Sequence, residues 1–211
     1  MAKKQSKETE IVVVLDRSGS METIATSTVE GFNSFLKEQK AVKGKGFLTL
    51  VQFDDAYQVD YKSEPIKKVK DLVEGETFVP RASTALFDAI GKTINEIKTE
   101  RNVVFVIITD GMENASREFT RETIFKMIEA KKKEGWNFLF LAANQDAIST
   151  GCVMGIGAAN AMTFSANNTS NSAMYTNFSS KISSYRSSAS VGTATSDMLS
   201  FSDEDRKEVN Q

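Results

Sequence analysis

Two stretches of consecutive apolar, mostly β-branched residues limit most strongly how this chain can fold. They span residues 11–15 and 103–108, and neither alternates apolar with polar side chains. Such a run predicts a strand that is buried on both faces, as in a parallel sheet covered by helices. Each run ends in a short polar segment with an aspartate, Asp16 after the first and Asp110 after the second.

Further segments alternate between strand-like and helix-like patterns. Strands are predicted at residues 11–15, 47–53, 57–61, 103–108, 136–141 and 161–164. Helices are predicted at residues 21–40, 66–73, 85–99, 120–134, 144–154 and 174–185. The alternating pattern of 57–61 is typical of an antiparallel edge strand. The order predicts an α/β fold with a doubly wound, mostly parallel central sheet, one antiparallel edge strand and helices on both faces.

Changes in composition suggest three parts of the chain. Residues 1–9 are a polar lead-in, and residues 10–186 are expected to form one domain. Residues 147–180 contain no charged side chain but can still form helices and a strand. Residues 187–211 are rich in serine and then charged, and we expect them to be a flexible tail.

The overall composition excludes several classes of function. The chain has no histidine, which removes histidine-based catalysis and histidine-ligated zinc. Its single cysteine cannot form an internal disulfide. The net charge of −2 gives no basic excess for binding nucleic acid. The sequence shows neither a secretory signal nor an apolar run long enough for a bilayer, so we expect no membrane association and a cytoplasmic location.

Oxygen-bearing side chains follow the two buried strands. Asp16, Ser18 and Ser20 alternate in one loop, and Thr84 and Asp110 lie in loops expected at the same sheet edge. Ligand sites in open α/β sheets lie at the carboxyl ends of the strands. Carboxylate and hydroxyl oxygens with little negative charge suit Mg²⁺ or Mn²⁺ rather than zinc. The sequence therefore predicts a divalent-cation site at this edge.

Three segments resemble the metal-ion-dependent adhesion site of von Willebrand factor type A domains. They are residues 16–20, 83–86 and 107–111, and the likeness in order and context covers about residues 8–186. The resemblance implies that Asp16, Ser18, Ser20, Thr84 and Asp110 coordinate the cation directly or through water. Many members have two glycines before the threonine, whereas this chain has Ala82 and Ser83.

The resemblance implies binding rather than catalysis. A protein partner would complete the metal shell with an aspartate or glutamate carboxylate, and the oligomeric state stays open. One alternative is an assembly or scaffold role in a phage or bacterial stress system, with contacts through residues 147–180 and the tail. A less favoured one is a magnesium-dependent phosphotransfer enzyme, since Ser18 stands where such enzymes need a second aspartate. Each ligand also has a structural alternative. Asp16, Ser18 and Ser20 would form a strand-to-helix turn in which a serine or the aspartate caps the helix. Thr84 would cap its own helix, and Asp110 would be a turn residue.

Overall fold

A central six-stranded sheet forms the middle of the molecule. The structure is a computed structural model, and it describes residues 6–144 and 146–210. The strand order is β3-β2-β1-β4-β5-β6, and every neighbouring pair is parallel except β2 with β3. The strands are β1 Thr9–Asp16, β2 Gly46–Phe53, β3 Tyr57–Pro65, β4 Asn102–Thr109, β5 Asn137–Ala143 and β6 Ala161–Phe164. This confirms the doubly wound sheet with an antiparallel edge strand.

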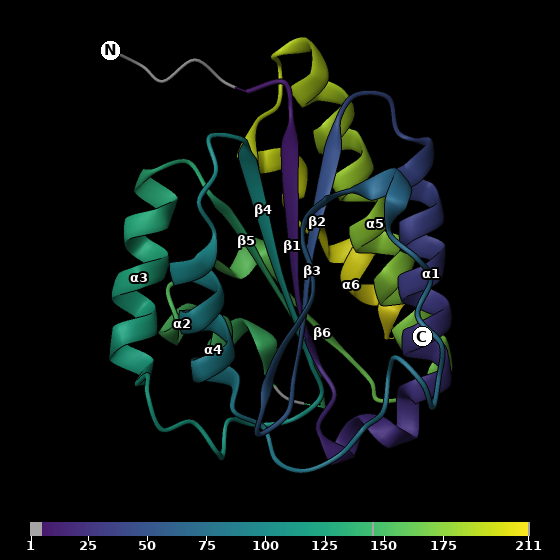
Figure 1. The fold of residues 1–211 in the computed structure, drawn as a ribbon, viewed down its shortest axis with the longest axis vertical. Helices are drawn as coiled ribbons and strands as arrows, with labels where there is room; N and C mark the ends of the chain where they lie inside the picture. The colour runs from purple at the N-terminus through teal and green to yellow at the C-terminus, as the bar shows by residue number, and fades with distance from the viewer. Residues whose placement is uncertain (1–5, 145, 211) are drawn as a thin grey trace.

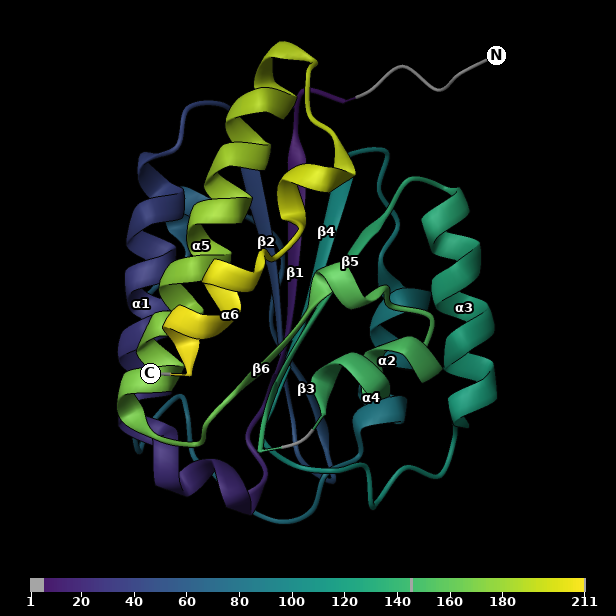
Figure 2. The same cartoon turned by 180° about the vertical axis from the view of Figure 1, so that it is seen from behind.

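Helices cover both faces of the sheet (Figures 1 and 2). On one face lie α2 Leu86–Glu96, α3 Arg121–Lys133 and α4 Ala147–Val153. On the other face lie α1 Ala25–Ala41, α5 Asn168–Val191 and α6 Asp203–Val209. Short 3-10 helices span Gly19–Ile24, Ile66–Lys68, Ala158–Asn160 and Ser196–Leu199. Among the described residues, none of the helices combines the length and apolar composition that crossing a bilayer requires.

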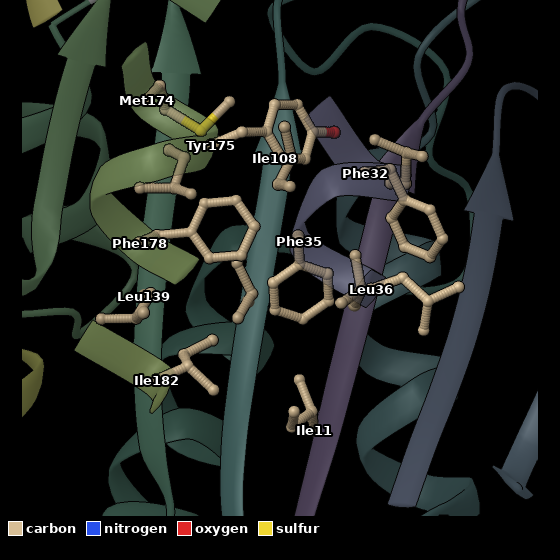
Figure 3. Close-up of a cluster of buried hydrophobic side chains, with 14 of the residues drawn as sticks. Ile11, Phe32, Phe35, Leu36, Ile108, Leu139, Met174, Tyr175, Phe178 and Ile182 are labelled. Atoms are coloured by element: carbon tan, nitrogen blue, oxygen red, sulfur yellow. The ribbon is translucent and has the colours of Figure 1, made fainter. Parts of the chain in front are cut away.

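Alternate residues of the buried strands supply two separate cores. In β1, Val13 faces α1 and α5, whereas Val12 and Val14 face α2 and α3. Figure 3 shows the first core, where the rings of Phe35 and Phe178 pack between α1 and α5 with centroids 5.0 Å apart. Burial on both faces explains why these strands show no polar alternation.

The carboxyl ends of the parallel strands meet at one edge of the sheet. The chain runs from β1 to β2 on one side and later places β4 on the other side of β1, so order reverses between β1 and β4. The loops that follow β1 and β4 lie together with the loop before α2 at the lower end of Figure 1. This reversal point is where open α/β sheets place their ligands.

The helix predicted over residues 66–73 is wrong. Only the 3-10 turn Ile66–Lys68 forms, and the chain then continues without helix to the start of α2. The side chain of Asn33 accepts a hydrogen bond from the N–H of Leu72 at 2.8 Å and donates one to its carbonyl at 2.9 Å. Because this side chain satisfies the backbone of Leu72, the segment buries Ile66, Val69 and Leu72 without forming a helix.

The C-terminal segment also differs from the expected flexible tail. Helix α5 continues to Val191, and the chain then forms a 3-10 turn and α6. Leu199, Phe201 and Val209 are buried in the core beside α1 and α5. The serine-rich composition and isolated apolar residues of this segment gave no periodic signal, but its contacts with the domain order it. At the other end, residues 1–5 of the polar lead-in lie outside the described residues, and Thr9 already belongs to β1.

Candidate metal centre

The loop after β1 carries three of the five predicted ligands. Asp16 and Ser18 are buried, and Ser20 is exposed. The carboxylate Oδ1 of Asp16 accepts a hydrogen bond from the N–H of Ser18 at 2.6 Å, which curls the chain directly after the strand. The hydroxyl oxygens of Ser18 and Ser20 are 3.2 Å apart, so both side chains point to the same place.

Hydroxyl groups from two distant loops surround Gly111. A methyl group at Gly111 would lie 3.0 Å from Oγ1 of Thr84, 3.4 Å from Oγ of Ser20 and 3.7 Å from Oγ of Ser18. The hydroxyl of Ser20 also donates to Oδ1 of Asp110 at 2.7 Å. Thr84 is 2% exposed, and its hydroxyl forms no hydrogen bond with another described residue. The structure therefore brings these side chains together.

The two carboxylates of the site, those of Asp16 and Asp110, are partly desolvated by burial. Burial raises the pKa of Asp16 to about 6, although hydrogen bonds from Thr109 and Ser18 favour its charged form. The hydroxyl of Thr109 donates to Oδ2 of Asp16 at 2.5 Å. Burial also raises the pKa of Asp110. The negative charge of Asp110 in turn raises the pKa of Asp16. Among the described residues neither carboxylate forms an ion pair, so a bound cation would favour the charged form of both.

The loop that carries Thr84 lies against the loop after β1. The N–H of Gly19 donates to the carbonyl of Ala82 at 3.1 Å, and the N–H of Arg81 donates to the carbonyl of Arg17 at 2.8 Å. Ala82 adopts a left-handed conformation with φ of 57°, a region that favours glycine. The loop is therefore fixed by backbone contacts although it lacks the two glycines that many von Willebrand factor type A domains have.

A buried carboxylate fastens these two loops to the end of β2. Asp54 is fully buried, and its Oδ2 lies 3.0 Å from Nε of Arg17 and 2.7 Å from Nε of Arg81. Burial by itself would raise the pKa of Asp54, but the hydrogen bond from Arg81, the N–H of Ala56 and the charge of Arg17 together hold it below its usual value. Asp54 thus stays ionised and positions Arg17, the residue that follows Asp16.

The loop after β4 is anchored on α2. Asp88 accepts hydrogen bonds at 2.9 Å from three successive backbone N–H groups, those of residues 117–119. Glu113 accepts a hydrogen bond from the N–H of Phe87, and Asn114 accepts one from the N–H of Thr84, both at 2.9 Å. Asp88 therefore acts as an anchor for this loop, and it is neither an exposed helix residue nor aimed at the site.

The helix-cap alternatives are wrong for Ser18 and Thr84. Ser18 precedes the 3-10 turn Gly19–Ile24 but makes no capping hydrogen bond through its side chain. Helix α2 begins after Ala85, so Thr84 is not its capping residue. Their hydroxyls are available for other contacts.

Sequence reasoning missed the positioning residues Arg17, Asp54 and Thr109. Asp54 follows the apolar strand β2 as Asp16 follows β1, and this shared position was the available signal. Thr109 and Arg17 gave none, because their roles depend on contacts with residues distant in the chain.

The donor set fits a hard divalent cation. Three hydroxyls and the Asp110 carboxylate converge, and the Asp16 carboxylate lies at the start of the same loop as Ser18. Oxygen-only sets of this kind suit Mg²⁺ or Mn²⁺. Across residues 6–144 and 146–210, no cluster of three or more acidic or cysteine side chains could hold a metal. The candidate site is therefore poor in negative charge, and the small Gly111 leaves the space between the hydroxyls open.

Comparison with known proteins gives structural relatives only. No family model matches the sequence, and no curated protein matches it. Proximal thread matrix protein 1 from the mussel byssus has a TM-score of 0.61 at 15% identity over 85% of this chain and 47% of its own length. The von Willebrand factor domain of a type V pilus tip protein from Porphyromonas gingivalis has a TM-score of 0.61 at 11% identity, over 83% of this chain and 95% of that domain.

In a further structure of the mussel protein, the metal-ion-dependent adhesion site (MIDAS) motif is occupied by zinc. That structure covers 85% of this chain and 46% of that protein, with a TM-score of 0.59 and 15% identity. The chain thus spans about half the length of the mussel protein. These low identities show the fold alone, and the fold is that of von Willebrand factor type A domains.

Proposed function

We propose that this chain is a binding module that recognises a protein partner through a divalent cation, Mg²⁺ or Mn²⁺, at the candidate metal centre. Asp16, Ser18, Ser20, Thr84 and Asp110 would hold the cation directly or through water. An aspartate or glutamate carboxylate of the partner would complete the shell. The observation that carries the proposal is the convergence of three hydroxyls from two loops around Gly111, beside the Ser20–Asp110 hydrogen bond.

The bound cation would supply an electrophilic position that accepts a carboxylate oxygen. The protein side chains provide only two negative charges, so positive charge would remain to attract the partner. Ser18, Ser20 and Thr84 are neutral donors that orient the site without cancelling that charge. Asp54 pairs with Arg17 on the loop after β1 and with Arg81 on the loop before α2, and so holds the two loops beside each other.

Binding fits the site better than turnover. The chain has no histidine, and Ser18 takes the position in which a phosphotransfer enzyme of this topology would need its second carboxylate. The similar structures include a byssal thread protein and a pilus tip domain, which supports a role in contact between proteins.

The test is capture of partners from the native host in Mg²⁺ and, in parallel, in EDTA. A protein retained only with Mg²⁺ is then purified and its affinity measured directly. We expect Thr84→Val to weaken this affinity about tenfold or more, because it removes an oxygen that has no other hydrogen-bond partner. Thr26→Val, on the exposed surface of α1, is the control and should bind as the wild type does. Equal retention in EDTA, or equal affinity of both variants, would contradict the proposal.

A further inference from the structure

A second pocket lies at the end of the sheet opposite the candidate metal centre. It has a volume of about 360 Å³ and is formed by the end of α1, the start of β2 and the end of β3. The connection between α1 and β2 is at the upper end of Figure 1, whereas the loops of the metal centre are at the lower end. Apolar side chains form much of its wall: Val42, Phe47, Pro65 and Ile66.

Arg186 of α5 lines this pocket and is only 3% exposed. Its Nη1 donates to the backbone carbonyl of Gln39 at 2.7 Å and to the side-chain oxygen of Gln39 at 3.0 Å, which fixes the guanidinium. Its Nε is buried without a hydrogen-bond partner, and Nη2 has no acceptor among the described residues. Nε is enclosed by protein atoms, so Nη2 is the unsatisfied donor that a ligand in the pocket can reach.

The charge of Arg186 is also uncompensated. Within residues 6–144 and 146–210, no carboxylate forms an ion pair with it. Burial lowers the pKa of Arg186 to about 10, so the side chain remains a cation at neutral pH. A buried cation without a counter-charge destabilises a fold unless an anion or water compensates it.

Gly46 makes room for this guanidinium. A methyl group at Gly46 would lie 2.2 Å from Nη2 and 2.6 Å from Cζ of Arg186. Any larger residue would displace the arginine from the pocket wall. The glycine at the start of β2 is therefore required for the close approach of the two groups.

The rest of the pocket adds positive charge and no acidic group. Lys45 pairs with Glu8 at 3.0 Å, and Lys40 lies 3.8 Å from Asp71. Lys67 is exposed and forms no ion pair in the described part of the chain. The lining thus combines an unsatisfied buried arginine, a free lysine and apolar walls.

We propose that this pocket binds a small organic carboxylate with an apolar chain. The Nη2 group of Arg186 would donate to a carboxylate oxygen of the ligand, and the charge of the guanidinium would favour the ionised carboxylate. Lys67 adds attraction at the mouth, and the apolar walls cover the chain of the ligand. The volume is within the usual range for small-molecule sites.

Calorimetric titration of the full chain with octanoate tests this inference, with octan-1-ol, acetate and inorganic phosphate as separate arms. We expect saturable binding of octanoate at one site, with acetate and octan-1-ol binding at least about tenfold more weakly because each keeps only half of the recognised chemistry. Tighter binding of phosphate than of octanoate would overturn the assignment to a carboxylate with an apolar chain. No saturable binding of octanoate would overturn the proposal altogether.

Variants locate the binding in the pocket. Arg186→Gln and Gly46→Ala should each weaken octanoate binding about tenfold or more, because the first removes the guanidinium and the second displaces it from the pocket wall. Lys67→Ala, at an exposed position that leaves folding intact, should weaken it about threefold, whereas Lys133→Ala on the distant α3 should not. Octanoate binding that is unchanged in Lys67→Ala and in whichever of the other two variants folds would contradict the proposal.

Discussion

Ala82 is the residue of the site loops with the clearest backbone strain. Its φ of 57° lies in the left-handed region, where a side chain with a β-carbon is disfavoured. Its carbonyl accepts a hydrogen bond from Gly19, so the conformation is fixed by the neighbouring loop.

We expect Ala82→Gly to raise the free energy of unfolding by about 1 kcal/mol, because glycine adopts this conformation without steric cost. Urea unfolding measures the change. Ala56→Gly, in an exposed turn without positive φ, is the matched control and should lower stability slightly. A loss of stability in Ala82→Gly equal to that in the control would show that the strain is absent.

At the residue scale, the sequence was sufficient for positions that follow an apolar strand. Asp16 and Asp110 could be located because each follows an apolar run that is buried on both faces. In the structure the two carboxylates interact through their charges, and Asp110 accepts a hydrogen bond from Ser20. The hydroxyls of Ser18, Ser20 and Thr84 lie together around Gly111. Their role as metal ligands stays a prediction. Residues that act through side-chain contacts with distant parts of the chain could not be located in this way. Thr109, which donates to Asp16 from a neighbouring strand, is an example.

At the scale of elements, the hydrogen bonds of Asp88 join α2 to the loop after β4. Burial would raise the pKa of this carboxyl, but three backbone N–H groups and the charge of Lys92 hold it below its usual value. A depressed pKa means that the ionised form stabilises the fold. This contribution is complete above the ordinary carboxyl pKa and is lost as pH falls through the lower value of the folded state.

We expect Asp88→Asn to lower the free energy of unfolding at pH 7 by about 1–3 kcal/mol. The difference from wild type should begin to shrink as pH falls below about 4, the ordinary carboxyl pKa, and should be smallest below the lower pKa of the folded state, where the wild-type carboxyl is also neutral. Thermal unfolding over a range of pH measures this. Asp55→Asn, in the exposed turn after β2, should change little. A difference that does not vary with pH would contradict the role assigned to the charge of Asp88.

Elements were predictable where the pattern of apolar residues reflected burial, and not where contacts with distant residues replaced regular hydrogen bonding. The parallel strands were identified correctly because both faces are covered. The segment 66–73 has apolar residues at helical spacing. The side chain of Asn33 nevertheless satisfies the backbone of Leu72, and the segment does not form a helix. A hydrogen bond across a distance of 39 residues leaves no trace in local periodicity.

At the scale of the whole molecule, the C-terminal segment completes the core beside α1 and α5. Leu199 is fully buried there, although its sequence surroundings are rich in serine and threonine. Disorder was expected because this composition has few apolar residues. The few apolar residues of the segment, Leu199, Phe201 and Val209, are nevertheless buried in the core that α1 and α5 form with the sheet.

We expect Leu199→Ala to lower the free energy of unfolding by about 2–5 kcal/mol, as is usual for a buried leucine. Chemical denaturation measures it, and Val191→Ala is the control because Val191 is 69% exposed. A flexible tail would give two equal and small effects, and that result would contradict the observed packing.

In the proposed site, five oxygen-bearing side chains from three segments bind one divalent cation. Electron paramagnetic resonance of Mn²⁺, titrated into the purified chain and displaced by Mg²⁺, tests this directly without a partner. We predict one Mn²⁺ per chain in the wild type. We also predict that Asp16→Asn, which removes one of the two charges near the ion, reduces affinity by about tenfold or more while the thermal unfolding transition is retained. Absence of a site, or an Asp16→Asn variant that binds Mn²⁺ as tightly as the wild type, would contradict the account.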